Sequence, residues 1–111
     1  MKKTVSLKRN EDFQYVFKRG KTKGSGILVA FVVPNDMGLN RLGVTVSKKM
    51  GKAVMRNRLR RRIKEAFRAF EESLTAGHDI VILPKPELAK ASFAELQKTL
   101  KYLMKKQGLL E

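Results

Sequence analysis

Hydrophobic and polar residues along this chain repeat with two periods, one typical of helices and one typical of strands. Phe13, Val16 and Phe17 are spaced i, i+3, i+4 and therefore predict a first amphipathic helix. Asn10 is expected to be the N-cap of this helix, because its side chain can accept a hydrogen bond from the first turn. Gly20 is expected to lie just past the end of the helix.

A longer helical pattern runs from about residue 53 to about residue 74, and Gly77 follows it. Its apolar side chains recur every three or four residues and are expected to face the core: Met55, Leu59, Ile63, Ala66, Phe67 and Phe70. A last helix begins after Ser92, which forms a capping-box pattern with Glu95. Its expected apolar stripe is Phe93, Leu96, Leu100, Leu103 and Met104.

Three segments carry strand patterns: a β-prone run at 27–33, an imperfect alternation at 41–47, and a short apolar run at 80–83. We expect the 41–47 strand to be the antiparallel partner of the 27–33 strand, because turn-forming residues connect them. Residues 21–26 predict a loop or a short edge strand. The order helix, strand, strand, helix, strand, helix, with that optional strand, predicts an α+β fold in one domain, residues 1–111. A small mixed sheet of three to four strands would pack with three helices.

The charge of the chain narrows the possible classes of function. There are 25 Lys and Arg residues against 10 Asp and Glu residues, a formal net charge of +15. Repulsion among so many positive charges destabilises the folded protein, so we expect a polyanion as its partner. Nucleic acid is the more common polyanionic partner, and an anionic membrane surface is the alternative. No apolar run approaches the roughly 20 residues of a membrane span. Residues 1–5 lack the apolar stretch of a signal peptide, and cysteine is absent. We therefore expect a cytoplasmic protein without a membrane partner.

The positive charge is concentrated in the long helix, where residues 56–64 hold six basic side chains in nine positions. Like charges spaced i, i+4 each cost about 0.2–0.5 kcal/mol, so a bound anion would stabilise this helix. Arginine suits phosphate, because its guanidinium donates two parallel hydrogen bonds. Lys48, Lys49 and Lys52 extend the patch to the helix N-terminus, where backbone N–H groups favour an anion. The helix face opposite the apolar stripe carries Asn57, Arg60, Arg61, Lys64 and Arg68.

Other interpretations of this basic surface stay open at this point. A basic helix face can simply keep a protein soluble, but the density of arginine and the scarcity of nearby acids favour nucleic-acid binding. Charge alone does not separate RNA from DNA, although no helix-turn-helix partner precedes the long helix. Among nucleic-acid-binding proteins, a ribosomal or ribosome-assembly protein and a DNA-binding regulator therefore both stay open.

Three phenylalanines are candidates for a second kind of nucleic-acid contact. Phe13 and Phe17 lie one helical turn apart, and Phe31 stands in the first strand. Periodicity alone favours core packing for all three. The alternative is a groove in which single-stranded bases stack on the rings, worth about 1–3 kcal/mol per base. His78 is the only histidine and the carboxylates are dispersed, so we expect neither catalytic residues nor a metal site in this chain.

Four stretches together resemble a known family. They are residues 8–13 (Lys-Arg-Asn-Glu-Asp-Phe), 16–20 (Val-Phe-Lys-Arg-Gly), 41–54 and 56–65. The most specific part is the string Ser-Lys-Lys-x-Gly-x-Ala-Val-x-Arg-Asn-Arg at residues 47–58. From about residue 8 to about residue 104, the chain is similar to the protein component of bacterial ribonuclease P.

The resemblance implies a ribonucleoprotein function. In that family a catalytic RNA, with Mg²⁺ bound mainly by the RNA, removes the 5′ leader from precursor tRNA. The implied partners are the catalytic RNA and the leader, and no protein partner is implied. The fold implied is the ribosomal protein S5 domain 2-like fold with a left-handed βαβ crossover, which the usual right-handed rule would not predict.

The resemblance also implies roles for residues that match the family pattern. The side chains implied to contact the catalytic RNA are Lys48, Lys49, Arg56, Asn57, Arg58, Arg60, Arg61 and Lys64, to which the helix face adds Arg68. A groove between the first helix and the sheet would bind the leader, lined by Phe13, Phe17 and Phe31. Phe31 stands where the family can have a tyrosine, which keeps stacking but removes a hydroxyl group.

Overall fold

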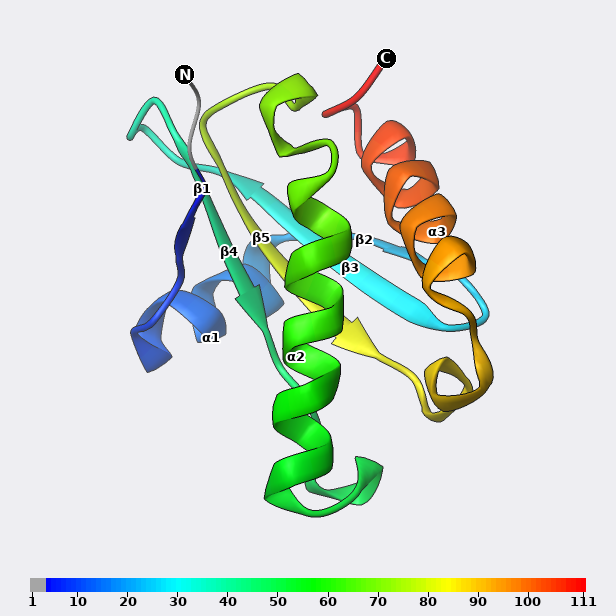
Figure 1. Cartoon of the computed structure of the whole chain (residues 1–111). Helices are drawn as coiled ribbons and strands as arrows, with labels where there is room; N and C mark the ends of the chain where they lie inside the picture. Colours follow the sequence, from blue (N-terminus) through cyan, green and yellow to red (C-terminus); the bar gives the residue numbers. More distant parts are fainter. Residues whose placement is uncertain (1–3) are drawn as a thin grey trace.

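The computed structural model describes residues 4–111, so residues 1–3 of the basic start lie outside the described part. One sheet separates α1 from α2 and α3 (Figure 1). The elements in chain order are β1 (Thr4–Ser6), α1 (Asn10–Arg19), β2 (Lys21–Gly24), β3 (Leu28–Pro34), β4 (Asn40–Val44), η1 (Lys48–Met50), α2 (Ala53–Arg68), η2 (Glu71–Ser73), β5 (His78–Pro84), η3 (Pro86–Lys90) and α3 (Phe93–Lys106). Among the described residues, we find no helix that combines the length and the apolar character needed to cross a membrane.

The sheet is mixed and has the strand order β1-β4-β5-β3-β2. β5 is central, and Ile80, Val81 and Ile82 are all fully buried, as expected of a strand covered on both faces. β5 pairs antiparallel with β3 and parallel with β4. The predicted pairing of residues 41–47 with residues 27–33 is therefore wrong, because the fully apolar β5 lies between the two strands.

Two edge strands complete the sheet. β2 corresponds to the short edge strand predicted as one possibility for residues 21–26, and it pairs antiparallel with β3. β1 is a strand that the sequence analysis did not predict, and it pairs in parallel with β4 over residues 4–6. Three residues are too few to show a clear alternation of apolar and polar positions. The sheet therefore has five strands rather than three to four.

The connection from β4 through α2 to β5 joins two parallel neighbours. In Figure 1 both strands run down the view, β5 lies to the right of β4, and α2 returns in front of the sheet. This crossover is left-handed, as the family resemblance implies and against the usual preference. It places the N-terminal end of α2 near the end of β4.

The sheet separates two hydrophobic clusters. α2 and α3 cover the face to which Leu28 and Val32 of β3 point, and α1 covers the face to which Phe31 and Val33 point. This alternation follows from the period of two along a strand. The cluster beneath α1 is small, and the phenylalanines packed against it stay partly buried. The partly exposed phenylalanines Phe13, Phe17 and Phe31 therefore lie on the α1 side of the sheet.

Two helix ends differ from the predicted ones. α1 begins at Asn10 itself, so Arg9 occupies the cap position without a side-chain hydrogen bond, and Asn10 is not the N-cap. α2 ends at Arg68, before the predicted end near residue 74, and the 3-10 turn η2 follows. Phe70 and Leu74, which flank this turn, are still buried. The apolar pattern therefore continues through the break in the helix.

Two predicted core side chains are exposed at helix starts. Met55 is 43% exposed, because the first turns of α2 extend past the end of the sheet (Figure 1). Phe93, in the first turn of α3, is 38% exposed. The other predicted core positions of these two helices are buried. The predicted cap of α3 is confirmed, since Ser92 Oγ accepts a hydrogen bond from the backbone N–H of Glu95 at 3.1 Å.

Candidate nucleic-acid interface

An aromatic groove lies between α1 and the end of β4. It has a volume of about 360 Å³. Phe13 and Phe17 of α1 line it on one side, and Arg60 reaches it from α2. The remaining lining residues are Lys8, Asn10, Gln14, Val44 and Thr45. The groove thus combines aromatic rings with side chains that can donate hydrogen bonds to bases or phosphates.

The groove exists because the edge strand β1 is short. β1 pairs with β4 only through residues 4–6, after which the chain turns into α1. β1 therefore does not cover the end of β4 at Val44 and Thr45, and these two residues line the groove. α1 and α2 lie on opposite faces of the sheet, yet both reach this uncovered end. For this reason Arg60 and Phe13 line the same groove.

Gly43 of β4 lies directly beneath the ring of Phe13. A Cβ atom at this position would lie 2.5 Å from both Cε1 and Cζ of that ring. Nonbonded carbon atoms are in favourable contact only at about 3.5–4.0 Å, so any larger residue would displace the ring. Glycine at position 43 therefore leaves the space that the ring of Phe13 occupies against the strand, and so sets the depth of the groove.

Phe17 and Phe31 continue the aromatic surface across the sheet. Their ring centroids lie 5.0 Å apart in an edge-to-face arrangement, with an interplanar angle of 89°. Phe31 contacts Phe17 but is not among the residues that line the groove itself. All three phenylalanines pack against the cluster beneath α1 and remain partly exposed. The three rings therefore belong partly to the core and partly to the surface, and base stacking on them stays a prediction.

The basic side chains predicted to bind RNA fall into two groups. Arg56, Arg60 and Lys64 are half-buried and form an i, i+4 row along one flank of α2. Lys64 lines a small hollow beside β1, whereas Arg60 lines the groove. The exposed group is Lys48, Lys49, Asn57, Arg58, Arg61 and Arg68. We call these nine side chains on η1 and α2 the α2 face.

Arg60 joins the α2 face to the groove. Its Nη1 donates a hydrogen bond to Oδ1 of Asn57, one turn earlier, at 2.8 Å. Four of the five N–H donors of the guanidinium stay free of this bond. A phosphate held by Arg60 would therefore lie directly beside a base in the groove.

Two further arginines of α2 differ in their surroundings. Arg62 supports the fold, because its Nη2 donates to the backbone carbonyl of Ala91 at 3.1 Å and so links α2 to the segment before α3. The Nε of Arg56 is buried and has no hydrogen-bond partner among residues 4–111. A buried donor without an acceptor destabilises a fold.

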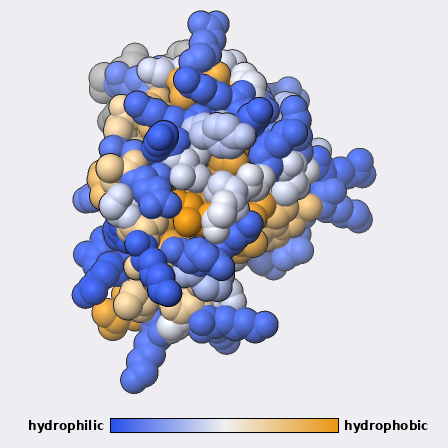
Figure 2. Space-filling view, turned by 90° about the vertical axis from the view of Figure 1, so that its right-hand side faces the viewer, coloured by the Kyte–Doolittle hydropathy of each residue, from blue (hydrophilic) through white to orange (hydrophobic). Residues whose placement is uncertain are grey.

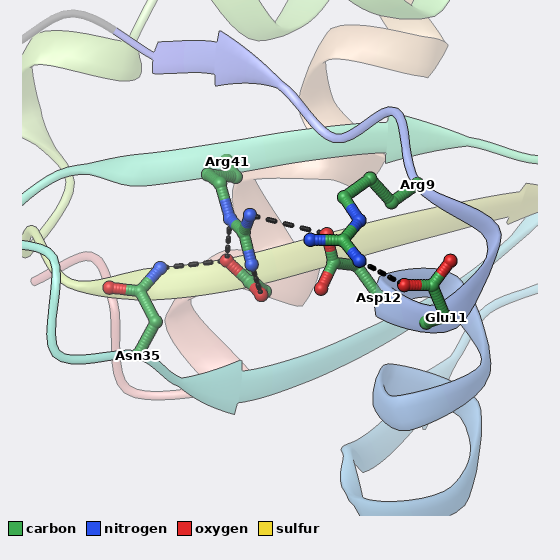
Figure 3. Close-up of polar contacts among 6 residues, drawn as sticks. Arg9, Glu11, Asp12, Asn35 and Arg41 are labelled. Carbon is green, nitrogen blue, oxygen red and sulfur yellow. Dashed lines mark hydrogen bonds and ion pairs between the residues drawn. The ribbon is translucent and has the colours of Figure 1, made fainter.

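A polar network holds α1 against the sheet beside the groove (Figure 3). Arg41 of β4 donates from Nε to Oδ1 of Asp79 at 2.8 Å and from Nη2 to Oδ2 at 2.6 Å, a two-point contact. Its Nη1 donates to Asp12 of α1 at 3.4 Å. Asn35 donates a further hydrogen bond to Asp79 at 2.7 Å. Because Asp12 directly precedes Phe13, this network also fixes the position of the first groove ring.

The network keeps its central pair charged. Burial opposes ionisation of Asp79, but the hydrogen bonds from Arg41 and Asn35 outweigh it and lower the pKa of Asp79 below its ordinary value. The hydrogen bond to Asp79 likewise raises the pKa of Arg41, although burial acts in the opposite direction. Both groups are therefore ionised at neutral pH.

Within residues 4–111, no three or more His, Cys, Asp or Glu side chains lie together in a way that could hold a metal ion. His78 has a structural place at the start of β5: its backbone N–H donates to Oδ1 of the buried Asn40 at 2.9 Å.

Sequence reasoning missed four polar residues of the groove: Lys8, Asn10, Gln14 and Thr45. A signal existed for two of them, because Asn10 and Gln14 follow the same i, i+3, i+4, i+7 spacing that contains both groove phenylalanines. Lys8 and Thr45 gave no such signal. Their place in the groove depends on the pairing of β1 with β4, which the sequence did not reveal.

Known proteins resemble this chain over nearly its whole length. Residues 1–108 match the family model described as Ribonuclease P. The ribonuclease P protein component of Clostridium kluyveri is 42% identical over 105 residues, which cover 93% of this chain and 94% of that protein. The corresponding protein of Alkaliphilus metalliredigens is 34% identical over 110 residues, which cover 99% of each.

Solved structures give the same result. The RNase P protein from Thermotoga maritima superposes with a TM-score of 0.83 at 33% identity, covering 91% of this chain and 96% of that one. The RNase P protein from Staphylococcus aureus superposes with a TM-score of 0.87 at 28% identity, covering 98% of this chain and 100% of that one. The chain therefore belongs to the ribonuclease P protein family, the protein components of the endoribonuclease that processes the 5′ ends of tRNA.

Proposed function

We propose that this protein, as one domain over residues 1–111, assists the catalytic RNA of ribonuclease P in the cytoplasm by binding two RNA segments. The α2 face binds the catalytic RNA, and the aromatic groove binds the 5′ leader of precursor tRNA. The observation that carries this proposal is that Phe13, Phe17 and Arg60 line one groove of about 360 Å³. Rings that can stack on bases and a guanidinium that can bind phosphate thus lie together.

The α2 face suits a structured RNA backbone. Arg58, Arg61 and Arg68 are exposed, and each can bind phosphate oxygens in a two-point contact. In this proposal Mg²⁺ belongs to the RNA, and the side chains of this chain bind and orient RNA rather than the ion.

The groove suits a single-stranded leader of variable sequence. Stacking on an aromatic ring uses the face that every base has, so it tolerates different sequences. Asn10 and Gln14 on the same wall can hydrogen-bond to base edges or to sugar hydroxyls. Mature tRNA has no leader, so the groove would favour the precursor over the product.

The proposed function is tested by cleavage of precursor tRNA with transcribed bacterial ribonuclease P RNA at low Mg²⁺. We expect this protein to stimulate cleavage at the mature 5′ end strongly, and to show no cleavage without the RNA. No stimulation, with RNA binding intact, would contradict the proposal. The protein would then be a general RNA-binding protein, and the ribosomal alternative would come first.

Substitution of Phe17 by alanine is expected to weaken binding of precursor tRNA to the holoenzyme about tenfold, which corresponds to about 1.4 kcal/mol of lost stacking. Binding of mature tRNA should stay unchanged, because only the precursor has a base to place in the groove. Equilibrium binding of both tRNAs to the reconstituted holoenzyme measures the difference.

Tyr15 offers a matched control on the same helix. It is 55% exposed and does not line the groove, so Tyr15→Ala removes an aromatic ring of α1 without changing the groove. This variant should bind both tRNAs like the parent protein. Equal losses for precursor and mature tRNA with Phe17→Ala, or loss of its circular dichroism signal, would assign Phe17 to the core instead.

A further inference from the structure

The outer side of α3 carries a second concentration of positive charge. It consists of four lysines and a tyrosine on α3 and two lysines on the neighbouring strand β2. We call this surface the α3 face: Lys21, Lys23, Lys98, Lys101, Tyr102, Lys105 and Lys106. All are exposed except the half-buried Lys23. Figure 2, which views the molecule from the α3 side of Figure 1, shows many hydrophilic side chains projecting from this surface.

The helical lysines lie opposite the core contacts of α3. Leu100 and Met104 are fully buried, whereas Lys98, Lys101 and Lys105 recur at i, i+3 and i+7 on the exposed side. At about 1.5 Å per residue, the three lysines span about 10.5 Å. The three lysines therefore form a line of positive charge along the helix, which suits an extended polyanion such as a nucleic-acid backbone.

The two lysines of β2 belong to the same surface. Lys21 and Lys23 lie opposite Val32 and Ala30 of β3, and directly opposite residues of an antiparallel pair share one face of the sheet. Val32 and Ala30 are part of the core beneath α2 and α3. Gln107, just after α3, links the helix to β2 and β3. Its Nε2 donates hydrogen bonds to the carbonyl oxygens of Lys21 at 2.7 Å and Ala30 at 3.1 Å. β2 is therefore held beside the end of α3.

Little negative charge offsets this surface. None of the ion pairs among residues 4–111 includes a lysine of the α3 face, and Glu95 in the first turn is the acid that α3 contains. The ammonium of Lys106 lies 5.4 Å from the ring centroid of Tyr102, a cation–π contact that holds its position. Like charges spaced i, i+3 and i, i+4 oppose helix formation, and a bound polyanion would remove that repulsion.

We propose that the α3 face is a second RNA-binding surface, which holds the phosphate backbone of an RNA segment other than the one on the α2 face. Lysine ammonium groups are point charges without the fixed fork of arginine, so this surface would bind without sequence preference. The two surfaces face different directions, since α2 is in front in Figure 1 and α3 lies at the side that Figure 2 turns toward the viewer. The inference rests on the proposed function in one respect, that the partner is RNA.

The salt dependence of binding to transcribed ribonuclease P RNA tests this proposal. Lys98→Gln with Lys105→Gln removes two charges from the α3 face. Lys18→Gln with Arg19→Gln removes two exposed charges from α1, on the opposite face of the sheet. At about 0.9 per phosphate contact, the α3 variant should make the slope of log K against log salt shallower by about 1.8. The α1 variant should keep the parent slope. Equal slopes in the two variants would overturn the proposal, because net charge alone would then explain the binding.

A tethered cleavage reagent tests the position of the second RNA segment. The chain has no cysteine, so Ala94→Cys in the first turn of α3 or Ala69→Cys after the end of α2 gives a unique attachment site for iron-EDTA. Both alanines are exposed. We expect the reagent at position 94 to cleave the RNA at nucleotides distinct from those cut from position 69. No cleavage from position 94 would overturn the proposal, and so would cleavage at the same nucleotides from both positions.

These outcomes separate a failure of this proposal from a failure of the proposed function. If the RNA does not bind the parent protein, the proposed function fails. If substitutions on the α2 face weaken binding while Lys98→Gln with Lys105→Gln has no effect, the α3 surface alone is rejected.

Discussion

Substitution of Arg41 by alanine is expected to lower the free energy of unfolding by about 3 kcal/mol, the low end of the range for breaking a buried ion pair. The side chain of Asp79 is only 6% exposed, so its carboxylate would stay buried with the hydrogen bond from Asn35 alone. We expect the low end of this range because the Arg41 side chain is 20% exposed to solvent. α1 would also lose the contact between Arg41 and Asp12. Urea unfolding at neutral pH, followed by circular dichroism, measures this loss.

A double variant shows whether an unpaired charge is the cause. Asp79→Asn removes the carboxylate charge, so Arg41→Ala with Asp79→Asn should be more stable than Arg41→Ala alone. If the double variant is equally unstable or less stable, lost packing rather than an unpaired charge explains the effect.

The same pair predicts how stability changes with pH. In the folded parent protein the pKa of Asp79 is lowered. The ionised carboxylate therefore adds to the free energy of unfolding above the ordinary pKa of aspartate, and this addition is lost as the pH falls below about 4. Without Arg41, burial would raise the pKa of Asp79, and protonation would relieve the unpaired charge in acid. The difference in unfolding free energy between the parent and Arg41→Ala should therefore narrow as the pH falls. A constant difference from neutral to acidic pH would contradict this account.

Replacement of Arg60, Arg61 and Lys64 together by glutamine is expected to weaken binding to the catalytic RNA about 100-fold at moderate salt, since each phosphate contact contributes about 1 kcal/mol or more. The slope of log K against log salt should become shallower by about three, at about one per contact. Glutamine has a helix propensity close to that of arginine and lysine, so α2 should remain folded. Filter binding across a salt series measures both effects.

A charge-preserving variant separates net charge from guanidinium geometry. Arg60→Lys with Arg61→Lys keeps both charges but removes the two-point contact with phosphate. It should keep the parent salt slope and lose only part of the affinity. An unchanged slope in the glutamine variant would show that these three side chains do not contact phosphate.

Local sequence patterns predicted much of this protein. The three helices, the strand at β5 and the basic side of α2 follow from residue spacing, because an apolar stripe and its opposite face lie within one element. The string around Arg56 to Arg58 likewise indicated the family, because the order of its residues is specific by itself. The predicted basic residues lie on and before α2, and all of them are at least partly exposed. Their contacts with RNA stay a prediction.

The position of the groove could not be predicted in this way. Its depth depends on Gly43 beneath Phe13, and its open end depends on the three-residue strand β1. Arg60 lines the groove because α1 and α2 reach the same end of β4 from opposite faces. None of these relations is visible in a local pattern, since Phe13 is 30 residues from Gly43 and 47 residues from Arg60 in the sequence.

The sequence by itself determined which residues are apolar, which are basic and how they are grouped along each helix. Only the tertiary structure decided the strand order, the left-handed crossover and the partial exposure of Phe13 and Phe17. The physical reason is that periodicity records which side of an element avoids water, but not which other element covers it. That choice depends on the packing of all elements at once, and here it places β5 between β3 and β4 and leaves the end of β4 uncovered.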